Sequence, residues 1–228
     1  MDLIVSLPRN DVSLAQAAAQ AGADALKVHM NVEHRASGTR FGNFAKEAPQ
    51  VQSIIQAVDI PVGLMPGAGV EILPTKQELE ELCSAGLNFL DIYTHHMPLW
   101  FLDLPVRLMV ALAEFNGFVE PPFYSTHFFW PPEKNQNRIW MCEASIFEPS
   151  QYGTSFTWHD YRLLRIIQEY VDVPLVVPTQ KQITPDDARW LKRSGTGGLM
   201  IGAVVTGTTE ESIATATAQY RAAIDAEE

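Results

Sequence analysis

The chain has 228 residues, of which 46% are hydrophobic and 19% charged, a balance typical of a globular protein that buries a large core. Its net charge of −11 argues against nucleic acid and anionic membrane surfaces as partners, because both repel an acidic protein. The N terminus lacks the pattern of a signal peptide, and no long apolar stretch predicts a membrane span. Cys83 and Cys142 show no CxxC spacing, so we expect reduced thiols in a cytoplasmic protein.

The first half of the chain alternates short apolar runs with helical patterns. The apolar runs predict strands at 3–6, 25–31, 60–64 and 89–93. Cap residues and periodicity predict helices from Asp11 or Ser13, over about 45–58, and from Thr75 to Gly86. Residues 31–44 are polar and contain glycines, which predicts a loop after the second strand.

The second half continues the alternation after one ambiguous segment. Residues 107–114 fit either a helix capped by Asp103 or a fifth strand. We favour the strand, because Pro121-Pro122 then begins a helix that extends to about Trp130. Further strands are predicted at 139–146, 174–177 and 198–201, and further helices over about 157–170, from Thr184, and over about 210–223.

Eight strands separated by helical patterns, with no linker or change of composition, predict a (β/α)8 barrel of the α/β class. A doubly wound open sheet is the alternative, but a count of eight favours the barrel. We expect one domain over residues 1–228. Barrel enzymes carry their sites at the carboxyl ends of the strands. The polar residues expected there are Ser6, Lys27, His29, Asn31, Asp91, Tyr93, His95, Glu114, Glu143, Ser145, Gln180 and Lys181.

The second strand contains a lysine where an apolar residue is expected. Alternation places Lys27, His29 and Asn31 on one face of this strand. Burial of an ammonium group is costly, and desolvation lowers its pKa, which would make the neutral amine a nucleophile. Asp91 and Glu143 interrupt two other apolar strands and are candidate partners across the barrel. An ion-pair network and a catalytic role as Schiff-base nucleophile or general base are therefore the two explanations for Lys27.

The last predicted strand ends in small residues, over 195–207. This segment resembles the phosphate-binding (ribulose-phosphate-type) TIM barrel superfamily, and the resemblance implies that backbone amides near Gly202 and Ala203 and a short helix N terminus hold a phosphate. The chain departs from that superfamily after the seventh strand, where Thr179, Gln180 and Lys181 stand in place of a Gly-Gly pair. Lys181 and Thr179 could replace that half of the phosphate site, and Gln180 and Lys181 are candidate residues for binding the substrate or its phosphate.

A narrower resemblance covers the first quarter of the chain. Residues 3–6, the Gly22-Ala23-Asp24 turn, Lys27 and Phe41-Gly42 resemble the archaeal furan phosphate synthase family, although its Asp-Val-Lys-Asn-Pro signature is replaced. The resemblance implies that Lys27 acts as a Schiff-base or acid/base residue in triose phosphate condensation.

Two arginines in the predicted loop are candidates for binding an anionic ligand. Arg35 and Arg40 would meet the anion through their guanidinium groups, next to Asn31, while Gly38 and Gly42 would let the loop close.

A metal site is an alternative use of the same polar residues. His29, Asp91, His95 or His96, and Glu143 supply nitrogen and oxygen ligands suited to zinc, manganese or iron. On a strand, only one of the two adjacent histidines would point inward.

The sequence thus predicts an enzyme without a cofactor that acts on a small phosphorylated carbonyl compound, as an aldolase-type lyase or isomerase. Lys27, His29, Asp91 and Glu143 are the candidate catalytic residues. The alternatives are a divalent-metal-dependent sugar phosphate epimerase and a ligand-binding barrel without catalysis. The aromatic cluster at 123–130 predicts either helix packing or a subunit contact in a homo-oligomer.

Overall fold

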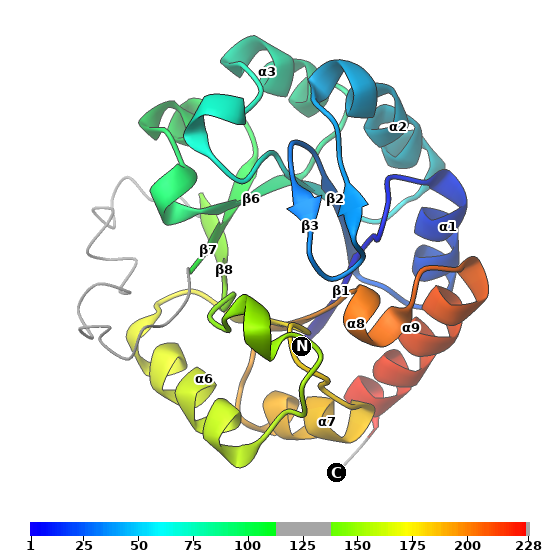
Figure 1. Ribbon diagram of the computed structural model, residues 1–228, viewed down its shortest axis with the longest axis vertical. Coiled ribbons are helices and arrows are strands. Elements are labelled where there is room, and N and C mark those ends of the chain that lie inside the picture. The colour runs from blue at the N-terminus through cyan, green and yellow to red at the C-terminus, as the bar shows by residue number, and fades with distance from the viewer. Residues whose placement is uncertain (113–137, 227–228) are drawn as a thin grey trace.

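The computed structural model describes residues 1–112 and 138–226, and its centre is a closed barrel of eight parallel strands (Figure 1). Neighbouring strands follow the order β1-β10-β9-β8-β7-β6-β5-β2, and pairing of β1 with β10 closes the barrel. The strands are β1 (Asp2–Ser6), β2 (Ala25–His29), β5 (Val62–Met65), β6 (Phe89–Tyr93), β7 (Arg107–Ala111), β8 (Ile139–Glu143), β9 (Leu175–Pro178) and β10 (Gly198–Ile201). The predicted (β/α)8 barrel is confirmed.

Helices surround the barrel. They are α1 (Val12–Gln20), α2 (Phe44–Ala57), α3 (Lys76–Ser84), α6 (Trp158–Tyr170), α7 (Pro185–Arg193) and α9 (Glu210–Asp225), with the single turn α8 (Ala203–Thr206) after β10. Four of them begin with a capping box at Thr75, Thr157, Thr184 and Thr209, in which the threonine hydroxyl and the side chain three residues later satisfy each other's backbone amides. The short 3₁₀ turns are η1 (Val70–Ile72), η2 (Thr94–His96), η3 (Leu99–Asp103) and η5 (Pro149–Gln151).

The ambiguous segment at 107–114 forms the strand β7 over Arg107–Ala111, as favoured. Only η2 and η3 connect it to β6, so this crossover contains no α-helix. The helix predicted from Pro121-Pro122 and the aromatic cluster at 123–130 lie outside the described residues. Both cysteines are free thiols, with Cys142 buried in β8.

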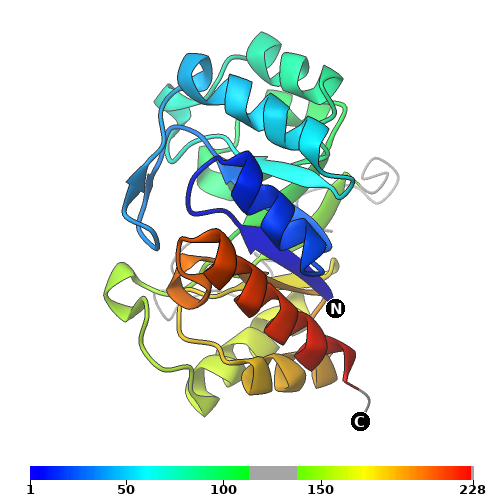
Figure 2. The ribbon, with the colours of Figure 1, turned by 90° about the vertical axis from the view of Figure 1, so that its right-hand side faces the viewer.

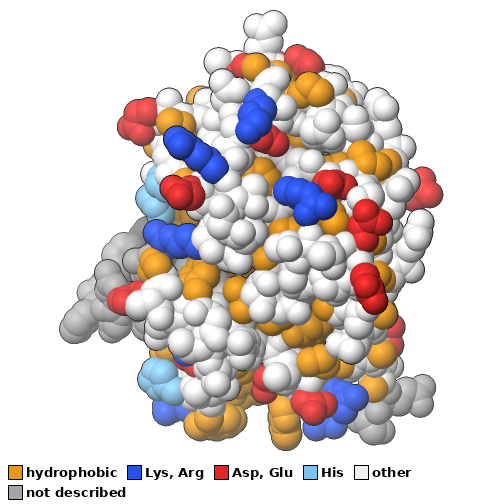
Figure 3. Space-filling view, turned by 45° about the vertical axis from the view of Figure 1, so that its right-hand side comes forward, with side chains coloured by type: hydrophobic (Ala, Val, Ile, Leu, Met, Phe, Trp, Pro, Cys, Tyr) orange, Lys and Arg blue, Asp and Glu red, His pale blue; other side chains and the backbone are white. Residues whose placement is uncertain are grey.

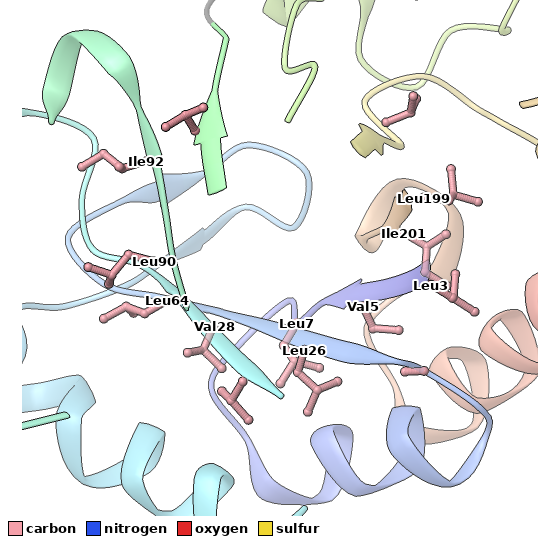
Figure 4. Close-up of a cluster of buried hydrophobic side chains, with 14 of the residues drawn as sticks. Leu3, Val5, Leu7, Leu26, Val28, Leu64, Leu90, Ile92, Leu199 and Ile201 are labelled. Atoms are coloured by element: carbon pink, nitrogen blue, oxygen red, sulfur yellow. The ribbon is translucent and has the colours of Figure 1, made fainter. Parts of the chain in front are cut away.

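The main apolar core lies between the barrel and the helices. Alternate strand residues such as Leu3, Val5, Leu26 and Val28 point outward into this layer (Figure 4). Their neighbours in the chain point into the barrel, because successive side chains of a strand take opposite faces. The functional side chains therefore come from the inward-facing set.

A second apolar cluster closes the interior of the barrel at its N-terminal end. It consists of Ile4, Ala25, Phe89, Met109, Met141, Val176 and Met200. Gly63 makes room for it, because a Cβ atom at this position would lie 2.0 Å from the ring of Phe89. The polar inward-facing residues occupy the opposite, C-terminal part of the interior.

A small hairpin, β3 (Glu33–His34) paired with β4 (Thr39–Arg40), occupies part of the predicted loop at 31–44. Figure 2 shows it at the same end of the molecule as the segment after β8, away from the N terminus. The second strand ends at His29, two residues earlier than expected. Asn31 has a φ of 49°, so the prediction that it continues the strand face of Lys27 is wrong.

Basic and acidic side chains are interspersed on the face that Figure 3 presents, without a large region of one sign. Within the described residues, none of the helices combines the length and the apolar character needed to cross a membrane.

Candidate active site

A cavity of about 1040 Å³ opens at the C-terminal ends of the barrel strands. Inward-facing residues of β2, β6 and β8 line it in two levels, because residues two apart on a strand share a face. The deeper level holds Lys27, Asp91 and Glu143, next to the second apolar cluster in the interior of the barrel. The upper level holds His29, Tyr93 and Ser145, each of which lies two residues after its counterpart in the deeper level.

The deeper level is a buried ion-pair cluster. Lys27 Nζ donates to Glu143 Oε2 at 3.0 Å and also forms an ion pair with Asp91. All three residues are buried: Lys27 is 7% exposed, Glu143 is 5% exposed and Asp91 is 1% exposed. Neither carboxylate oxygen of Asp91 accepts a hydrogen bond of ordinary geometry from the described residues. Lys27, Asp91 and Glu143, which the sequence placed on three strands, therefore meet at one point.

The two carboxylates reverse the expected pKa shift of the lysine. Burial lowers the pKa of Lys27, but the charges of Asp91 and Glu143 raise it above its ordinary value. The two carboxylates therefore favour the ammonium form of Lys27, where burial alone would favour the neutral amine. Burial and the charge of Glu143 hold the pKa of Asp91 well above its usual range. Burial also raises the pKa of Glu143, yet Lys27 brings it below the ordinary value, so Glu143 is the ionised partner.

Neutral imidazoles form one side of the upper level. His29 Nε2 lies 3.4 Å from Ser6 Oγ, and the His29 ring packs against His34 and Phe41 of the hairpin at 4.6 and 4.9 Å. Burial, with smaller contributions from Lys27, lowers the pKa of His34 to about 4 and that of His29 well below its ordinary value. His34 Nδ1 also contacts Ser37 Oγ at 2.8 Å within the hairpin, and Ser37 Oγ donates to the Pro8 carbonyl at 3.1 Å, which ties the hairpin to the loop after β1.

Hydroxyl and amide groups form the other side. Tyr93 OH lies 2.7 Å from Ser145 Oγ, and Gln180 Nε2 donates to Ser145 Oγ at 2.8 Å and to Tyr152 OH at 2.6 Å. Gln180 was a predicted site residue, and Tyr93 and Ser145 were among the polar residues expected at the strand ends. Tyr152 was missed as a site residue, because it comes from the loop after β8, where no periodicity indicates which side chains point inward.

The end of β10 provides the predicted phosphate-binding region. Gly202 lines the cavity, and its amide donates to Thr179 Oγ1 at 3.0 Å. Ala203 begins α8, in which the amides of Val205 and Thr206 bond the Gly202 carbonyl, so only the amides of Ala203 and Val204 lack a carbonyl partner within this turn. A Cβ atom at Gly202 would meet Ser6 Cβ at an ordinary 3.5 Å, so packing within the protein does not require glycine here.

Four predicted binding residues, Asn31, Arg40, Lys181 and Ala203, do not belong to the described lining of the cavity, whereas Arg35 does. The Asn31 side chain donates to the Pro66 carbonyl at 3.1 Å and so joins two loops. Lys181 Nζ donates to Asp160 Oδ1 at 2.8 Å and lies 5.0 Å from the centre of the Phe147 ring. Arg40 is exposed on β4. Lys181 therefore has a buried structural partner, which the sequence did not indicate.

The residues of the alternative metal site do not form one group of metal ligands in the described part of the chain. Among the described residues, no group of three or more His, Cys, Asp and Glu side chains is arranged to hold a metal ion. His95 and His96 lie on the 3₁₀ turn η2 rather than on a strand, and both line the cavity rim. Asp91 and Glu143 are instead engaged by Lys27.

Comparison with known proteins adds structural relatives only, since no family model and no curated protein matches the sequence. Phosphoribosyl anthranilate isomerase from Thermus thermophilus superposes with a TM-score of 0.66 at 12% identity, covering 97% of this chain and 99% of that one. The chain is a TIM barrel. A 3-hexulose-6-phosphate synthase gives a TM-score of 0.65 at 15% identity, covering 98% and 100%. Thiamine phosphate pyrophosphorylase from Pyrococcus furiosus gives 0.59 at 15% identity, covering 98% and 95%. At these identities the likeness establishes the shared fold.

Proposed function

We propose that this protein is an enzyme that acts on a small phosphorylated carbonyl compound and moves a proton at the carbon beside the carbonyl group, as an aldolase-type lyase or an isomerase. The observation that carries the proposal is the buried cluster of Lys27, Asp91 and Glu143 at the floor of an open cavity. The substrate class is supported by the names of the three structurally similar proteins, because each name mentions a phosphorylated compound.

The chemistry follows from the opposite pKa shifts in the cluster. Glu143, the carboxylate with the lowered pKa, is the candidate base that takes a proton from carbon. Asp91, with its raised pKa, is the candidate group that takes up a proton and returns it to the substrate. The Lys27 ammonium group is the candidate for stabilising negative charge that develops on a substrate oxygen, because it is buried and lines the cavity.

The phosphate group is proposed to bind beside Gly202, at the first turn of α8. Backbone amides at a helix start favour an anion, and the Gly202 position leaves room for a ligand to approach the backbone. Arg35, in the lining of the cavity, adds a positive charge near its entrance. Gly202→Ala is therefore expected to fold normally and to weaken the binding of inorganic phosphate.

A Schiff base at Lys27 is the competing mechanism for the same reaction class. It requires the ammonium group first to pass a proton to Asp91 or Glu143, against the raised pKa of the lysine. Borohydride trapping distinguishes the two mechanisms. A covalent adduct at Lys27 with a carbonyl substrate supports the Schiff base, and turnover without an adduct supports acid–base chemistry.

The proposed function is tested with a panel of triose, tetrose and pentose phosphates in D₂O, followed by proton NMR. We expect at least one compound to exchange or lose the hydrogen on the carbon beside its carbonyl group. Glu143→Gln is expected to abolish this exchange, and Glu80→Gln, an exposed substitution on α3, serves as the matched control. A panel without exchange or turnover, under conditions where inorganic phosphate binds, would favour the ligand-binding barrel instead.

A further inference from the structure

The wall of the cavity opposite His29 and His34 is a connected network of three hydroxyl groups and one amide. Tyr93 belongs to β6, Ser145 and Tyr152 follow β8, and Gln180 follows β9. Ser145 and Gln180 are buried, and all four side chains line the cavity. Tyr93 and Ser145 lie two residues beyond Asp91 and Glu143 along the chain, which places them about 6–7 Å above the ion-pair cluster where the chain stays extended.

The direction of the hydrogen bonds in this network is fixed by one backbone amide. Phe147 N–H donates to Gln180 Oε1 at 3.2 Å, so this atom is the carbonyl oxygen of the side chain. The amide nitrogen of Gln180 therefore faces Ser145 and Tyr152 and gives one proton to each hydroxyl oxygen. Both hydroxyl groups are acceptors toward Gln180, and their own protons must be directed elsewhere.

A count of protons shows what the network presents to the cavity. Tyr93, Ser145 and Tyr152 carry three hydroxyl protons, and the contact between Tyr93 and Ser145 uses one of them. Two protons remain, one on Tyr152 and one on the Tyr93–Ser145 pair, and the hydrogen bonds among the described residues give neither an acceptor. Burial and the nearby charge of Glu143 raise the pKa of Tyr93, and burial raises that of Tyr152, so both phenols keep their protons.

We propose that these two hydroxyl donors bind the reacting oxygen of the substrate, a carbonyl oxygen that becomes an enolate, and that Gln180 is the positioning residue that turns both protons toward it. The two donors have no acceptor among the described residues and line the cavity, so a ligand oxygen there can accept from both, and an oxygen that gains negative charge strengthens both hydrogen bonds. The proposal rests on the proposed function for the identity of the substrate. The donor geometry itself is independent of the phosphate-binding region.

Three small probes test the donor pair by calorimetry. 2-Phosphoglycolate carries a phosphate and a planar carboxylate in place of an enolate, ethyl phosphate carries the phosphate alone, and glycolate carries the carboxylate alone. We expect the wild type to bind 2-phosphoglycolate at least about tenfold more tightly than ethyl phosphate, the effect of one hydrogen bond to a charged group. Tyr152→Phe is expected to remove most of this preference and to leave the affinity for ethyl phosphate unchanged.

Two further variants separate the network from simple loss of structure. Gln180→Glu keeps the shape and the acceptor for Phe147, but its second oxygen accepts from both Ser145 and Tyr152 and so turns both protons away from the cavity. It should lose the preference for 2-phosphoglycolate more completely than Tyr152→Phe, and ethyl phosphate reports the effect of the added charge. Tyr161→Phe, on α6 outside the cavity lining, is the matched control and should bind all three probes as the wild type does.

The outcomes distinguish this inference from the proposed function. Equal affinity of the wild type for 2-phosphoglycolate and ethyl phosphate, or an unchanged preference in Tyr152→Phe, overturns the donor pair while the phosphate-binding region stands. Binding of glycolate that depends on Tyr152, without binding of ethyl phosphate, supports the donor pair and removes the phosphate-binding region near Gly202. Absence of binding by all three probes at millimolar concentration contradicts both.

Discussion

Replacing Lys27 with methionine removes the only cation that the structure shows in contact with Asp91 and Glu143 among the described residues, while largely keeping the side-chain volume. Both carboxyl groups then stay at the floor of the barrel, 1% and 5% exposed, without compensation. Removing one partner of a buried ion pair typically costs about 3–5 kcal/mol of folding stability, because the remaining charge is desolvated and unpaired. We expect a loss of this size for Lys27→Met at neutral pH.

The loss of folding stability in Lys27→Met should depend on pH. Its direction with pH follows from the pKa shifts of the two carboxyl groups. In the wild type the pKa of Glu143 is lowered, so its contribution to stability is present above its unfolded value and disappears as the pH falls through the folded value. Without Lys27, we expect burial to raise the pKa of both carboxyl groups in the folded state. Their protonated forms then stabilise the variant at low pH, and this stabilisation disappears as the pH rises. The difference between wild type and variant should therefore be smaller at about pH 5 than at about pH 7.

Urea unfolding followed by circular dichroism at both pH values measures these differences. Lys76→Met is the matched control, since Lys76 forms an exposed ion pair with Asp103 at 3.5 Å and should contribute at most about 1 kcal/mol. A loss of stability for Lys27→Met that is smaller than that of the control at neutral pH would show that Lys27 does not compensate the two carboxyl groups. A loss that stays constant or grows toward acid pH would show the same.

Three further predictions concern other parts of the barrel. Gly63→Ala should destabilise the protein by about 1–3 kcal/mol or more in chemical denaturation, because its Cβ atom would overlap the Phe89 ring in the closed end of the barrel. The imidazole of His34 should titrate near pH 4 by NMR, and protonation there should cost stability as the pH falls below about 6.5, since its folded pKa is lowered; titration near the ordinary value would contradict its burial. Lys181→Met should reduce the free energy of unfolding by about 3–5 kcal/mol through loss of the buried pair with Asp160, and a purely ligand-binding lysine would leave it unchanged.

The barrel and the meeting of its central charged residues were predictable from the sequence, for one physical reason. Lys27, Asp91 and Glu143 each interrupt an apolar strand, and a buried charge requires a partner. Once the eight strands indicate a barrel, their inward-facing charges have to share one interior. The direction of the lysine pKa was not predictable, because it depends on two carboxylates meeting the same nitrogen atom, which sequence spacing does not show.

The parts that were not predicted depend on loops and on contacts distant in sequence. Asn31 was assigned to the strand because alternation continues past His29, but its backbone turns into the left-handed region and its side chain joins a neighbouring loop. Lys181 has its partner Asp160 in the first turn of α6, where the sequence indicates only a helix cap. Tyr152 reaches the cavity from an irregular segment, which carries no periodic signal.

A crystal structure of the protein with 2-phosphoglycolate would show whether one cavity holds the phosphate beside β10 and the reacting oxygen above the Lys27 cluster. We expect the phosphate next to Gly202 and the first turn of α8, with the carboxylate accepting from the hydroxyl groups of Tyr152 and the Tyr93–Ser145 pair. Binding of the ligand outside the barrel mouth, or with its phosphate away from Gly202, would rule out this arrangement.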